Sequence, residues 1–431
     1  MRRFIQISVK DEKQFKRQLL YYMRNVGSGV IMDGNDYGGS HFQSSSIEFI
    51  AGVDKLDEIH EDFDQLEEFH TKHKDWMLGF LTYDLKNEFE KLESHHADEI
   101  ELPLFYFFIP RFLIIKKDGG WQVGFDQEKD SEEDVDLFLR SVKLEDFIEE
   151  EMPEVKLVSR VTHAEYVDVV KQIQHHINVG DVYEMNYCIE FYAQKLNVSP
   201  TQLYEKLNEV SPTPFSAFLK YHDKSLICAS PERYLKKEGN RLISQPIKGT
   251  SPRDPNPFID KANIEYLKTS EKERSENIMI TDLVRNDLSR VAKQGKVKVE
   301  ELCGVYSFRQ VHQMISTISA EMDERYSWVD AIKATFPMGS MTGAPKVSAM
   351  KLIEKYEDTK RGLYSGSVGY VTPDGDFDFN VVIRSMLYNQ KKGYLSFMVG
   401  GAITALSGAE KEYEECLVKA SAIMKVLNAE E

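Results

Sequence analysis

A series of strand-like segments separated by tight turns limits the possible folds of this chain more than any other pattern. Ser367 to Val371, Phe377 to Tyr388 and Tyr394 to Val399 are largely apolar and rich in β-branched and aromatic residues. Pro373-Asp374-Gly375 and Lys391-Lys392-Gly393, which separate them, are residue types that favour tight turns. Adjacent strands joined by tight turns pair antiparallel. The sequence therefore predicts an antiparallel sheet in this part of the chain.

A second hairpin is predicted in the first third of the chain. Leu102 to Ile115 is the most apolar stretch, and a turn signal at 116–120 separates it from the apolar run Trp121 to Phe125. The longer stretch contains Pro110 and Arg111 and is shorter than the roughly 20 residues that span a bilayer. We therefore expect buried strands here and no membrane-spanning segment.

Apolar residues at helical spacing predict three long helices after about residue 150. The pattern runs from Thr162 to Gly180, onward from Ser270, and from Ala409 to Leu427. On the second of these helices Asp287 falls within the apolar stripe. A buried carboxylate is costly unless it is paired, so Asp287 must find a partner.

Composition and charge limit the partners that this chain can have. Of its 431 residues 42% are hydrophobic and 29% are charged, which is typical of folded globular proteins. The 71 acidic residues exceed the 54 basic ones by 17, and a negative field of this size repels phosphate backbones and anionic membranes. Binding to nucleic acid or to a membrane is therefore not expected.

The cysteines and the first residues indicate a cytoplasmic protein. The four cysteines lie far apart, with the spacing of neither a zinc site nor a disulfide framework. The opening MRRFIQISVKDEK returns to charged residues before any apolar run of signal-peptide length. We therefore expect reduced thiols and a cytoplasmic location.

Two Glu-x-x-Glu steps form the first candidate site. Glu273 and Glu276 open one predicted helix, and Glu412 and Glu415 open another. Residues three apart share a helix face, so two such helices meeting end to end could place four carboxylates around Mg²⁺. The alternative is that these acids only complement the positive ends of the helix dipoles. Spacing alone leaves both interpretations open.

Lys248 and Glu232 are candidates for acid–base or nucleophilic chemistry. Lys248 stands beside a glycine turn at an apolar strand end, where partial desolvation would lower its pKa and make it a nucleophile or base. Glu232, in Ser230-Pro231-Glu232, could be a general acid or part of a surface turn. An exposed, unreactive lysine and a simple turn are the competing interpretations.

Three further features concern ligand binding. Arg384 is a charge in an otherwise apolar strand, so it needs an anionic partner, either a substrate carboxylate or an internal ion pair. Gly400 and Gly401 follow a strand and indicate close approach of a ligand to the backbone, or a bulge. The glycines of 339–346 do not have the spacing of a nucleotide phosphate loop.

Several segments together carry a family resemblance. They are, in chain order, Pro246-Ile247-Lys248-Gly249-Thr250, Ser275-Glu276-Asn277, Asp282 to Leu288, Gly343-Ala344-Pro345-Lys346, Ile383-Arg384-Ser385 and Gly400-Gly401. In this order they resemble the chorismate-utilising enzymes, which include anthranilate, aminodeoxychorismate, isochorismate and salicylate synthases. The resemblance covers roughly residues 155 to 425.

The resemblance implies an α+β fold with two large antiparallel β-sheets packed as a sandwich and helices on the outside. Residues 151–431 would form the chorismate-binding catalytic region. Residues 1–150 would be a divergent N-terminal region that belongs to the same body.

The resemblance also implies a metal site. Glu276 and Glu415 would bind Mg²⁺ directly, while Glu273 and Glu412 would reach the ion through water. The ion would hold the ring carboxylate of chorismate, which explains how an acidic protein can bind a dianion.

Substrate contacts and catalytic roles follow from the same resemblance. Tyr364 and Arg384 would hold the enolpyruvyl carboxylate. His312 would lie near the leaving group, and Glu232 would act as general acid. The remaining pocket residues would be Thr250, Thr342, Gly400 and Gly401.

Lys248 decides the branch of the family. Anthranilate synthases read Pro-Ile-Ala-Gly-Thr at 246–250, whereas the lysine form is typical of aminodeoxychorismate synthase component I. This implies that Lys248 attacks C2 of chorismate, that the C4 hydroxyl leaves, and that ammonia then enters at C4 and expels the lysine. The product would be 4-amino-4-deoxychorismate, for p-aminobenzoate and folate synthesis. No cysteine stands in a glutaminase-type nucleophile elbow, so a separate glutamine amidotransferase subunit would supply ammonia.

One position departs from the family pattern. Glu184 stands where isochorismate and salicylate synthases have a lysine base and where amination enzymes usually have glutamine. The absence of lysine argues against water as the nucleophile, and we expect Glu184 to help receive ammonia or to order a water. The alternative functions are anthranilate synthase component I and a non-catalytic partner of an amidotransferase.

Overall fold

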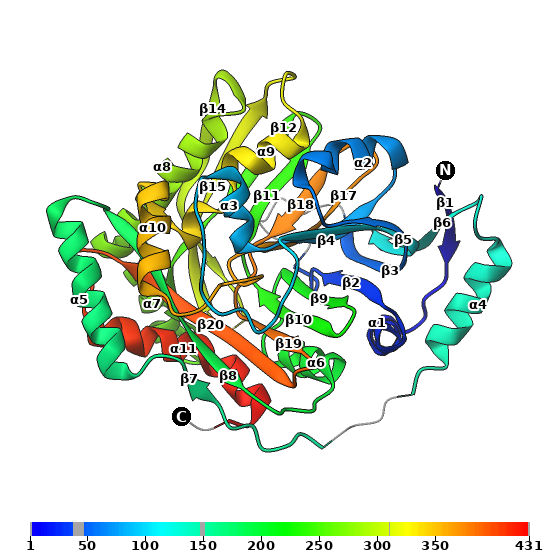
Figure 1. Ribbon diagram of the computed structural model, residues 1–431, viewed down its shortest axis with the longest axis horizontal. Helices are drawn as coiled ribbons and strands as arrows, with labels where there is room; N and C mark the ends of the chain where they lie inside the picture. The colour runs from blue at the N-terminus through cyan, green and yellow to red at the C-terminus, as the bar shows by residue number, and fades with distance from the viewer. Residues whose placement is uncertain (1, 38–46, 147–150, 310, 430–431) are drawn as a thin grey trace.

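The computed structural model describes residues 2–37, 47–146, 151–309 and 311–429, which form an α+β fold (Figure 1). The strands are β1 (Arg2–Ile7), β2 (Ser28–Asp33), β3 (Ile47–Ile59), β4 (Met77–Leu81), β5 (Phe105–Lys117), β6 (Gly120–Asp126), β7 (Val158–Ser159), β8 (Glu184–Ala193), β9 (Phe215–Tyr221), β10 (Lys224–Ser230), β11 (Arg233–Glu238), β12 (Arg241–Gln245), β13 (Ile247–Pro252), β14 (Ala292–Ser307), β15 (Val311–Met322), β16 (Gly343–Ala344), β17 (Ser367–Val371), β18 (Phe377–Asn380), β19 (Ser385–Asn389) and β20 (Tyr394–Ile403). The helices are α1 (Glu12–Tyr22), α2 (Leu66–His73), α3 (Lys86–Phe89), α4 (Glu132–Lys143), α5 (His163–Val179), α6 (Pro200–Val210), α7 (Pro257–Thr269), α8 (Glu271–Ser289), α9 (Trp328–Thr335), α10 (Lys346–Tyr356) and α11 (Ala409–Leu427).

Neighbouring strands pair antiparallel throughout, as the tight turns predict. One hydrogen-bonded path runs β8–β20–β19–β10–β9–β2–β3–β5–β4–β17–β18–β11–β12–β15. The strands that the sequence assigns to two sheets are therefore linked edge to edge in a continuous, strongly curved network. The α+β class with antiparallel sheets and outer helices is confirmed.

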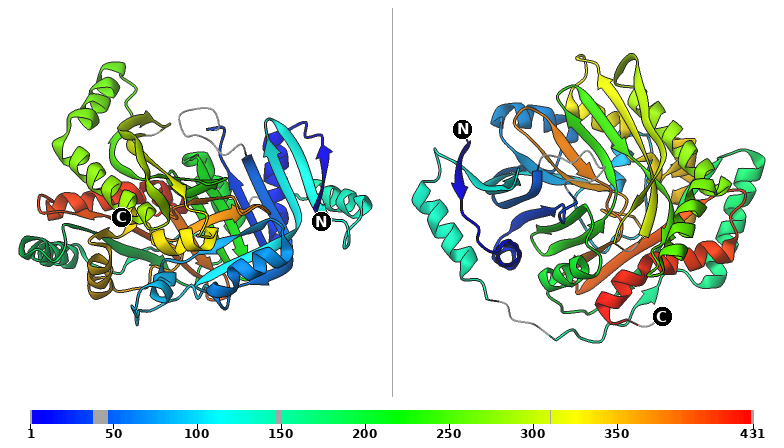
Figure 2. Two further views of the ribbon diagram at one scale, coloured as in Figure 1. Left: turned by 90° about the horizontal axis from the view of Figure 1, so that it is seen from above. Right: turned by 180° about the vertical axis from the view of Figure 1, so that it is seen from behind.

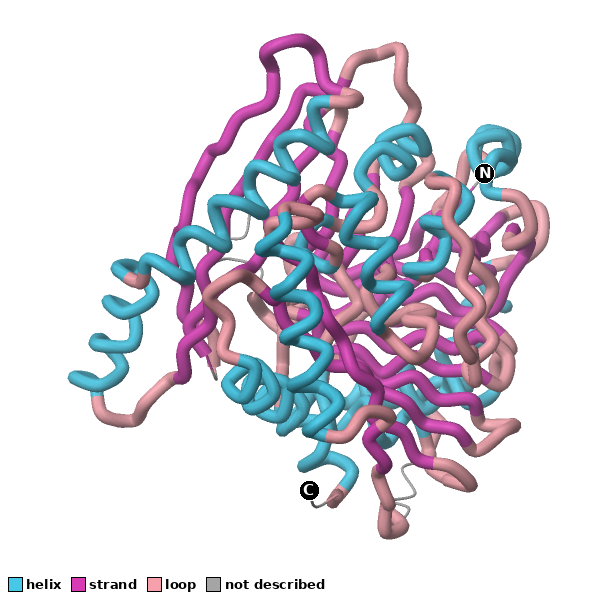
Figure 3. Tube along the Cα trace, turned by 60° about the vertical axis from the view of Figure 1, so that its left-hand side comes forward, coloured by secondary structure: helices cyan, strands magenta, loops and turns pink. Residues whose placement is uncertain are grey.

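The hydrophobic core has an inner part and two outer parts. The inner part is made mainly of strand residues such as Val30, Leu78 and Leu219, which face one another across the curved network. The outer parts lie between the strands and the surrounding helices, and they include Phe397 beneath α11 and Ile318 beneath α8. Figures 2 and 3 show the helices on the outside of the strands. This layering leaves the first turns of α8 and α11 next to β13 and β20, respectively.

Strands from before and after residue 150 share the same network. β2 pairs with β9 from Ser28 to Asp33, and β4 pairs with β17 from Met77 to Leu81. The N-terminal strands are therefore built into the sheet that carries the rest of the chain.

The predicted hairpins are present, with one correction. β5 and β6 form the hairpin predicted in the first third of the chain, and β17 has the predicted bounds. The predicted single strand from Phe377 to Tyr388 is wrong, because it is interrupted between β18 and β19. Arg384 lies in this break with a φ of 53°, a left-handed conformation that cannot continue a strand.

The three predicted helices are α5, α8 and α11. Thr162 caps α5 with a capping box, Gly180 ends that helix in the left-handed conformation, and Ser270 caps α8. Asp287 is buried and forms an ion pair with Lys346 at the start of α10. The predicted partner for this carboxylate is therefore present.

No helix among the described residues combines the length and the apolar composition needed to cross a membrane.

Candidate active site

Lys248 lies on β13, where a local irregularity turns its side chain toward the interior. The pairing of β13 with β15 shifts register between Ile247 and Thr250, and Gly249 has a φ of 96° that suits glycine. A Cβ atom at Gly249 would lie 3.1 Å from Glu273 Oε2, so glycine lets this carboxylate approach the strand. Asn277 of α8 donates to the carbonyl oxygen of Lys248 at 3.1 Å and fixes α8 against the bulge.

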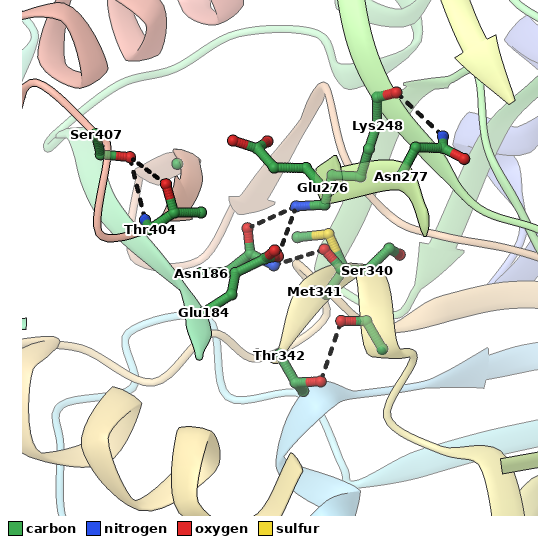
Figure 4. Close-up of polar contacts among 12 residues, drawn as sticks. Glu184, Asn186, Lys248, Glu276, Asn277, Ser340, Met341, Thr342, Thr404 and Ser407 are labelled. Carbon is green, nitrogen blue, oxygen red and sulfur yellow. Dashed lines mark hydrogen bonds and ion pairs between the residues drawn. The ribbon is translucent and has the colours of Figure 1, made fainter. Parts of the chain in front are cut away.

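The Lys248 ammonium points at two groups of β8 (Figure 4). Its Nζ lies 3.5 Å from Glu184 Oε1 and 3.5 Å from Asn186 Oδ1, and the side chain is 12% exposed. Burial alone would lower the pKa of Lys248, but the carboxylates of Glu184, Glu276 and Glu232 raise it above its usual value. The predicted lowering is therefore wrong, because three acids from elsewhere in the chain outweigh desolvation. Lys248 rests as an ammonium ion.

Glu232 is buried, so the surface-turn interpretation of Ser230-Pro231-Glu232 is wrong. Ser340 Oγ donates to Glu232 Oε1 at 2.6 Å. Burial raises the pKa of Glu232 to about 7, and the hydrogen bond from Ser340 opposes this rise. A carboxylic acid with this pKa is partly protonated at neutral pH and can donate a proton.

Asn186 connects the two sides of the site. Its Oδ1 accepts from Lys248, and its Nδ2 donates to the Ser340 carbonyl at 2.6 Å. Ser340 in turn contacts Glu232, so the lysine and the acid are joined through two residues. Arg361, which is fully buried, donates to the Asn186 carbonyl at 3.2 Å and is held by Glu357. The Arg361–Glu357 ion pair thereby holds β8, the strand that carries Glu184 and Asn186, in place opposite Lys248.

The two predicted Glu-x-x-Glu steps come together beside Lys248. Lys272 Nζ lies 3.4 Å from Glu412 and 3.9 Å from Glu276, and Lys419 lies 2.7 Å from Glu415. Burial raises the pKa of Glu273, and the nearby carboxylates of Glu415 and Glu412 add to this effect. The carboxylates of α8 and α11 therefore share one electrostatic environment, as the helix pattern predicts.

The chemistry of this acidic cluster fits a hard divalent cation. In the part of the chain that is described, no three such side chains already converge at metal-binding distance. However, the four carboxylates Glu273, Glu276, Glu412 and Glu415 outnumber the lysines that act on them, Lys272, Lys419 and Lys248. Oε1 of Glu276 is buried without a hydrogen-bond partner, and burial raises the pKa of this residue to about 7. A divalent cation bound by carboxylate oxygens would supply positive charge and a partner for this oxygen.

Tyr364 and Arg384 lie near the acidic cluster. Arg384 donates to the carbonyl of Lys419 at 3.3 Å, and among the described residues no carboxylate lies within ion-pair distance of its guanidinium. The internal ion pair considered for Arg384 is therefore not observed. Tyr364 is buried, with its hydroxyl 3.8 Å from Cys188 Sγ. The Arg384 guanidinium, which has no carboxylate partner among the described residues, can bind a substrate carboxylate.

The glycines after Val399 lie close to the acidic cluster. Lys419 Nζ donates to the Gly400 carbonyl at 2.8 Å. A Cβ atom at Gly401 would lie 3.2 Å from Glu412 Oε2. The backbone here therefore leaves room for the acids of α11.

In the described part of the chain, three predicted site residues, Thr250, Thr342 and His312, form no hydrogen bond with the Lys248 or Glu232 side chain. Thr250 is exposed on β13, and Thr342 is buried with its hydroxyl donating to the Gly339 carbonyl at 3.2 Å. His312 is fully buried, with its ring nitrogens 2.9 Å from Asp260 and 2.8 Å from Ser307. Because both nitrogens are engaged, His312 holds α7 against β15 in this structure.

Sequence reasoning missed Asn186, Ser340 and the two lysines of the acidic cluster. Asn186 follows Glu184 by two residues on a strand and so shares its face. Lys272 and Glu276, like Glu415 and Lys419, are four apart on a helix. These spacings are visible in the sequence and could have identified all but Ser340.

A separate cavity of about 310 Å³ shares no residue with this site. It is lined by residues of β2, β3, β9, β11 and β17–β18, among them Asp33, Arg233 and Asp378. Arg233 and Asp378 form an ion pair there at 2.9 Å.

Comparisons with known proteins give consistent results. A family model described as chorismate binding enzyme matches residues 11–425. Aminodeoxychorismate synthase component 1 of Bacillus subtilis is 35% identical over 373 residues, which are 82% of this chain and 77% of that protein. Anthranilate synthase component 1 of Aquifex aeolicus is 30% identical over 413 residues, which are 91% of this chain and 83% of that protein.

The fold also matches a solved structure. The crystal structure of anthranilate synthase component I from Streptococcus pneumoniae superposes with a TM-score of 0.77 at 24% identity. The match covers 88% of this chain and 91% of that one. At this identity the likeness concerns the fold alone, and it supports the antiparallel α+β architecture.

Proposed function

The chain belongs to the family of chorismate binding enzymes, and from this premise we propose that it is aminodeoxychorismate synthase component I. It would convert chorismate and ammonia to 4-amino-4-deoxychorismate. The observation that carries the proposal is the buried Lys248 ammonium, which points into the site between Glu184 and Asn186. This is the position that a lysine nucleophile needs.

The proposed reaction has two displacement steps. The Lys248 amine attacks C2 of the ring, the two conjugated ring double bonds shift, and the C4 hydroxyl leaves. Glu232 donates the proton that turns this hydroxyl into water, which its pKa of about 7 permits near neutral pH. Ammonia then attacks C4, and the bond between C2 and the lysine nitrogen breaks. A covalent intermediate thus divides one difficult substitution into two easier steps.

The same proposal includes Mg²⁺ at the acidic cluster. Glu276 and Glu415 would bind the ion directly, and Glu273 and Glu412 would bind it through water. A bound magnesium ion supplies positive charge that attracts and orients a substrate carboxylate. Arg384, whose guanidinium lacks a carboxylate partner among the described residues, would bind the second carboxylate of chorismate.

We also propose that ammonia comes from a separate glutamine amidotransferase subunit. Support comes from the relative's designation as component 1 and from the state of the cysteines. All four are buried, and burial raises the pKa of each of their thiols, which makes them poor nucleophiles. Ammonium ions in solution would replace the subunit in an assay.

The test is to identify the product chromatographically after incubation of the protein with chorismate, ammonium sulfate and Mg²⁺. We expect 4-amino-4-deoxychorismate, which keeps its pyruvyl group and yields p-aminobenzoate only after a lyase is added. Direct release of anthranilate with pyruvate would contradict the proposal and support the second candidate, anthranilate synthase component I, which the Aquifex relative favours. An absence of any chorismate turnover would leave a non-catalytic partner of an amidotransferase.

A further inference from the structure

The carboxylate of Glu184 is buried, and its one ion-pair contact among the described residues is with Lys248. Glu184 is 0% exposed on β8, and neither of its oxygens accepts a hydrogen bond. Within the described residues, Lys248 Nζ, at 3.5 Å, is the only cationic group at ion-pair distance from it. A buried carboxylate in this state destabilises the fold, and such groups concentrate at functional sites.

Lys248 needs a proton acceptor. An ammonium ion has no lone pair, so Lys248 cannot attack carbon until one proton leaves it. Glu232 is separated from it by Asn186 and Ser340, and Glu276 is not within ion-pair distance of Nζ in the described structure. Glu184 is therefore the carboxylate placed to receive the proton.

We propose that Glu184 is the catalytic base that takes a proton from the Lys248 ammonium before the attack on C2 and returns it after the lysine is released. This role rests on the proposed function of the site. It assigns different tasks to the two buried acids, because Glu184 serves the nucleophile and Glu232 serves the leaving hydroxyl.

The protons balance over one turnover. Lys248 passes one proton to Glu184, the neutral amine forms the bond to C2, and Glu232 gives its proton to the departing hydroxyl to form water. Ammonia then forms the bond to C4, and the electrons of the C2–N bond return to the lysine as a neutral amine. Glu232 recovers a proton from the new ammonium group, and Glu184 returns its proton to Lys248. The net reaction is chorismate plus ammonia to the amino product plus water.

The charged groups that face Glu184 come from three elements. Lys248 on β13 favours the ionised carboxylate, whereas burial and Glu412 on α11 raise the pKa of Glu184. Glu276 on α8 also faces it, because its own pKa is raised in part by Glu184. The opposing influences of burial and the ammonium ion suit a group that exchanges a proton with Lys248.

The test is single-turnover formation of the lysine adduct by Glu184→Gln, with chorismate and Mg²⁺ but without ammonia. Intact mass spectrometry detects the adduct as protein plus chorismate minus water. We expect the variant to form it about 100-fold more slowly than the wild type at neutral pH, since the amide cannot accept the proton. The ratio of variant to wild-type rates should rise with pH, because hydroxide then removes the proton. Ionisation of Glu232 affects both proteins and cancels in this ratio.

Two further variants make the result specific. Glu184→Asp keeps the carboxylate one methylene shorter and should recover at least about tenfold over Glu184→Gln. Glu190→Gln changes a buried acid of the same strand that contacts Arg160 and Tyr394 instead, and it should stay within about threefold of wild type. Circular dichroism and the unfolding midpoint show whether each variant is folded.

Each outcome has a defined meaning. A folded Glu184→Gln that forms the adduct at the wild-type rate at neutral pH overturns the role of Glu184 while the proposed function stands. A slow variant whose ratio to wild type does not change with pH also overturns it, because a structural defect would behave in this way. If the wild type makes no 4-amino-4-deoxychorismate, the proposed function and this role are both overturned.

Discussion

The two sides of the site hold their carboxylates in opposite ways. On the strand side Glu184 is fully buried, and among the described residues Lys248 is its only cationic neighbour at ion-pair distance. On the helix side the acids of α8 and α11 have lysine neighbours from their own helices, and Glu415 is 49% exposed. The strand side thus isolates one charge, whereas the helix side groups several charges, of which Glu415 reaches solvent.

This difference shows which exchange each side can support. Lys272 and Lys419 are partly exposed, so a divalent ion from solvent can take the place of their charge beside the acids. Glu184 has no access to solvent, so the only small cation that it can exchange with its neighbour is a proton. The helix side therefore suits metal binding and the strand side suits proton transfer. Each prediction below changes one of the two sides.

Removal of the strand-side nucleophile should have the largest effect. Lys248→Ala eliminates the amine, so we expect amination at C4 to fall by at least about 10³-fold and the covalent adduct to disappear. Product formation and intact mass spectra measure the two effects. Lys237→Gln is the matched control, because Lys237 is also a largely buried lysine but pairs with Asp376 outside the site. An unchanged rate in Lys248→Ala would remove the nucleophile from the mechanism.

The next largest effect should come from the helix side. Glu276→Ala removes a predicted metal ligand, so we expect activity to fall by about 10- to 100-fold and the Mg²⁺ concentration for half-maximal rate to rise. A Mg²⁺ titration at saturating chorismate measures both. Glu271→Gln alters an exposed acid in the first turn of the same helix and should leave the titration unchanged. A Glu276→Ala variant with the wild-type metal response would place the ion elsewhere.

The fold was largely predictable because its signals are local. The helix from Ala409 to Leu427 has the predicted bounds, since apolar spacing and capping depend only on neighbouring residues. The break at Arg384 was not predictable, because a left-handed residue between apolar segments leaves no trace in their pattern. The continuous sheet depends on pairings between distant strands, such as β4 with β17, which local periodicity does not specify.

The site was predictable in some of its members, the two acidic pairs and Lys248, but not in its electrostatics. The Glu-x-x-Glu spacing and the glycine beside Lys248 identified the groups that meet. The direction of the pKa shift of Lys248 was wrong, because it depends on acids brought from β8, α8 and the turn after β10. Glu184 and Lys248 are 64 positions apart, so no spacing rule links them.

A smaller effect is expected from a change at Lys272, on the helix side of the site. Lys272 contacts Glu276 and Glu412, where we propose that Mg²⁺ binds. Lys272→Met removes a competing positive charge, so Mg²⁺ should saturate the enzyme at about three- to tenfold lower concentration. The maximal rate should stay within about threefold of wild type. A higher Mg²⁺ requirement in this variant would show that Lys272 supports the metal site instead of competing with the ion.

The smallest expected effect concerns the acid that donates to the leaving hydroxyl. Glu232 acts while protonated, and its pKa is about 7, so adduct formation should decline as the pH rises through about 7. The hydrogen bond from Ser340 lowers this pKa, so its removal in Ser340→Ala should move the decline to higher pH by less than about one unit. Single-turnover rates between pH 5.5 and 9, a range of about two units on either side of 7, measure the shift. Ser367→Ala, which removes another buried hydroxyl, should leave the profile in place. A shift toward lower pH in Ser340→Ala would assign this decline to a group other than Glu232.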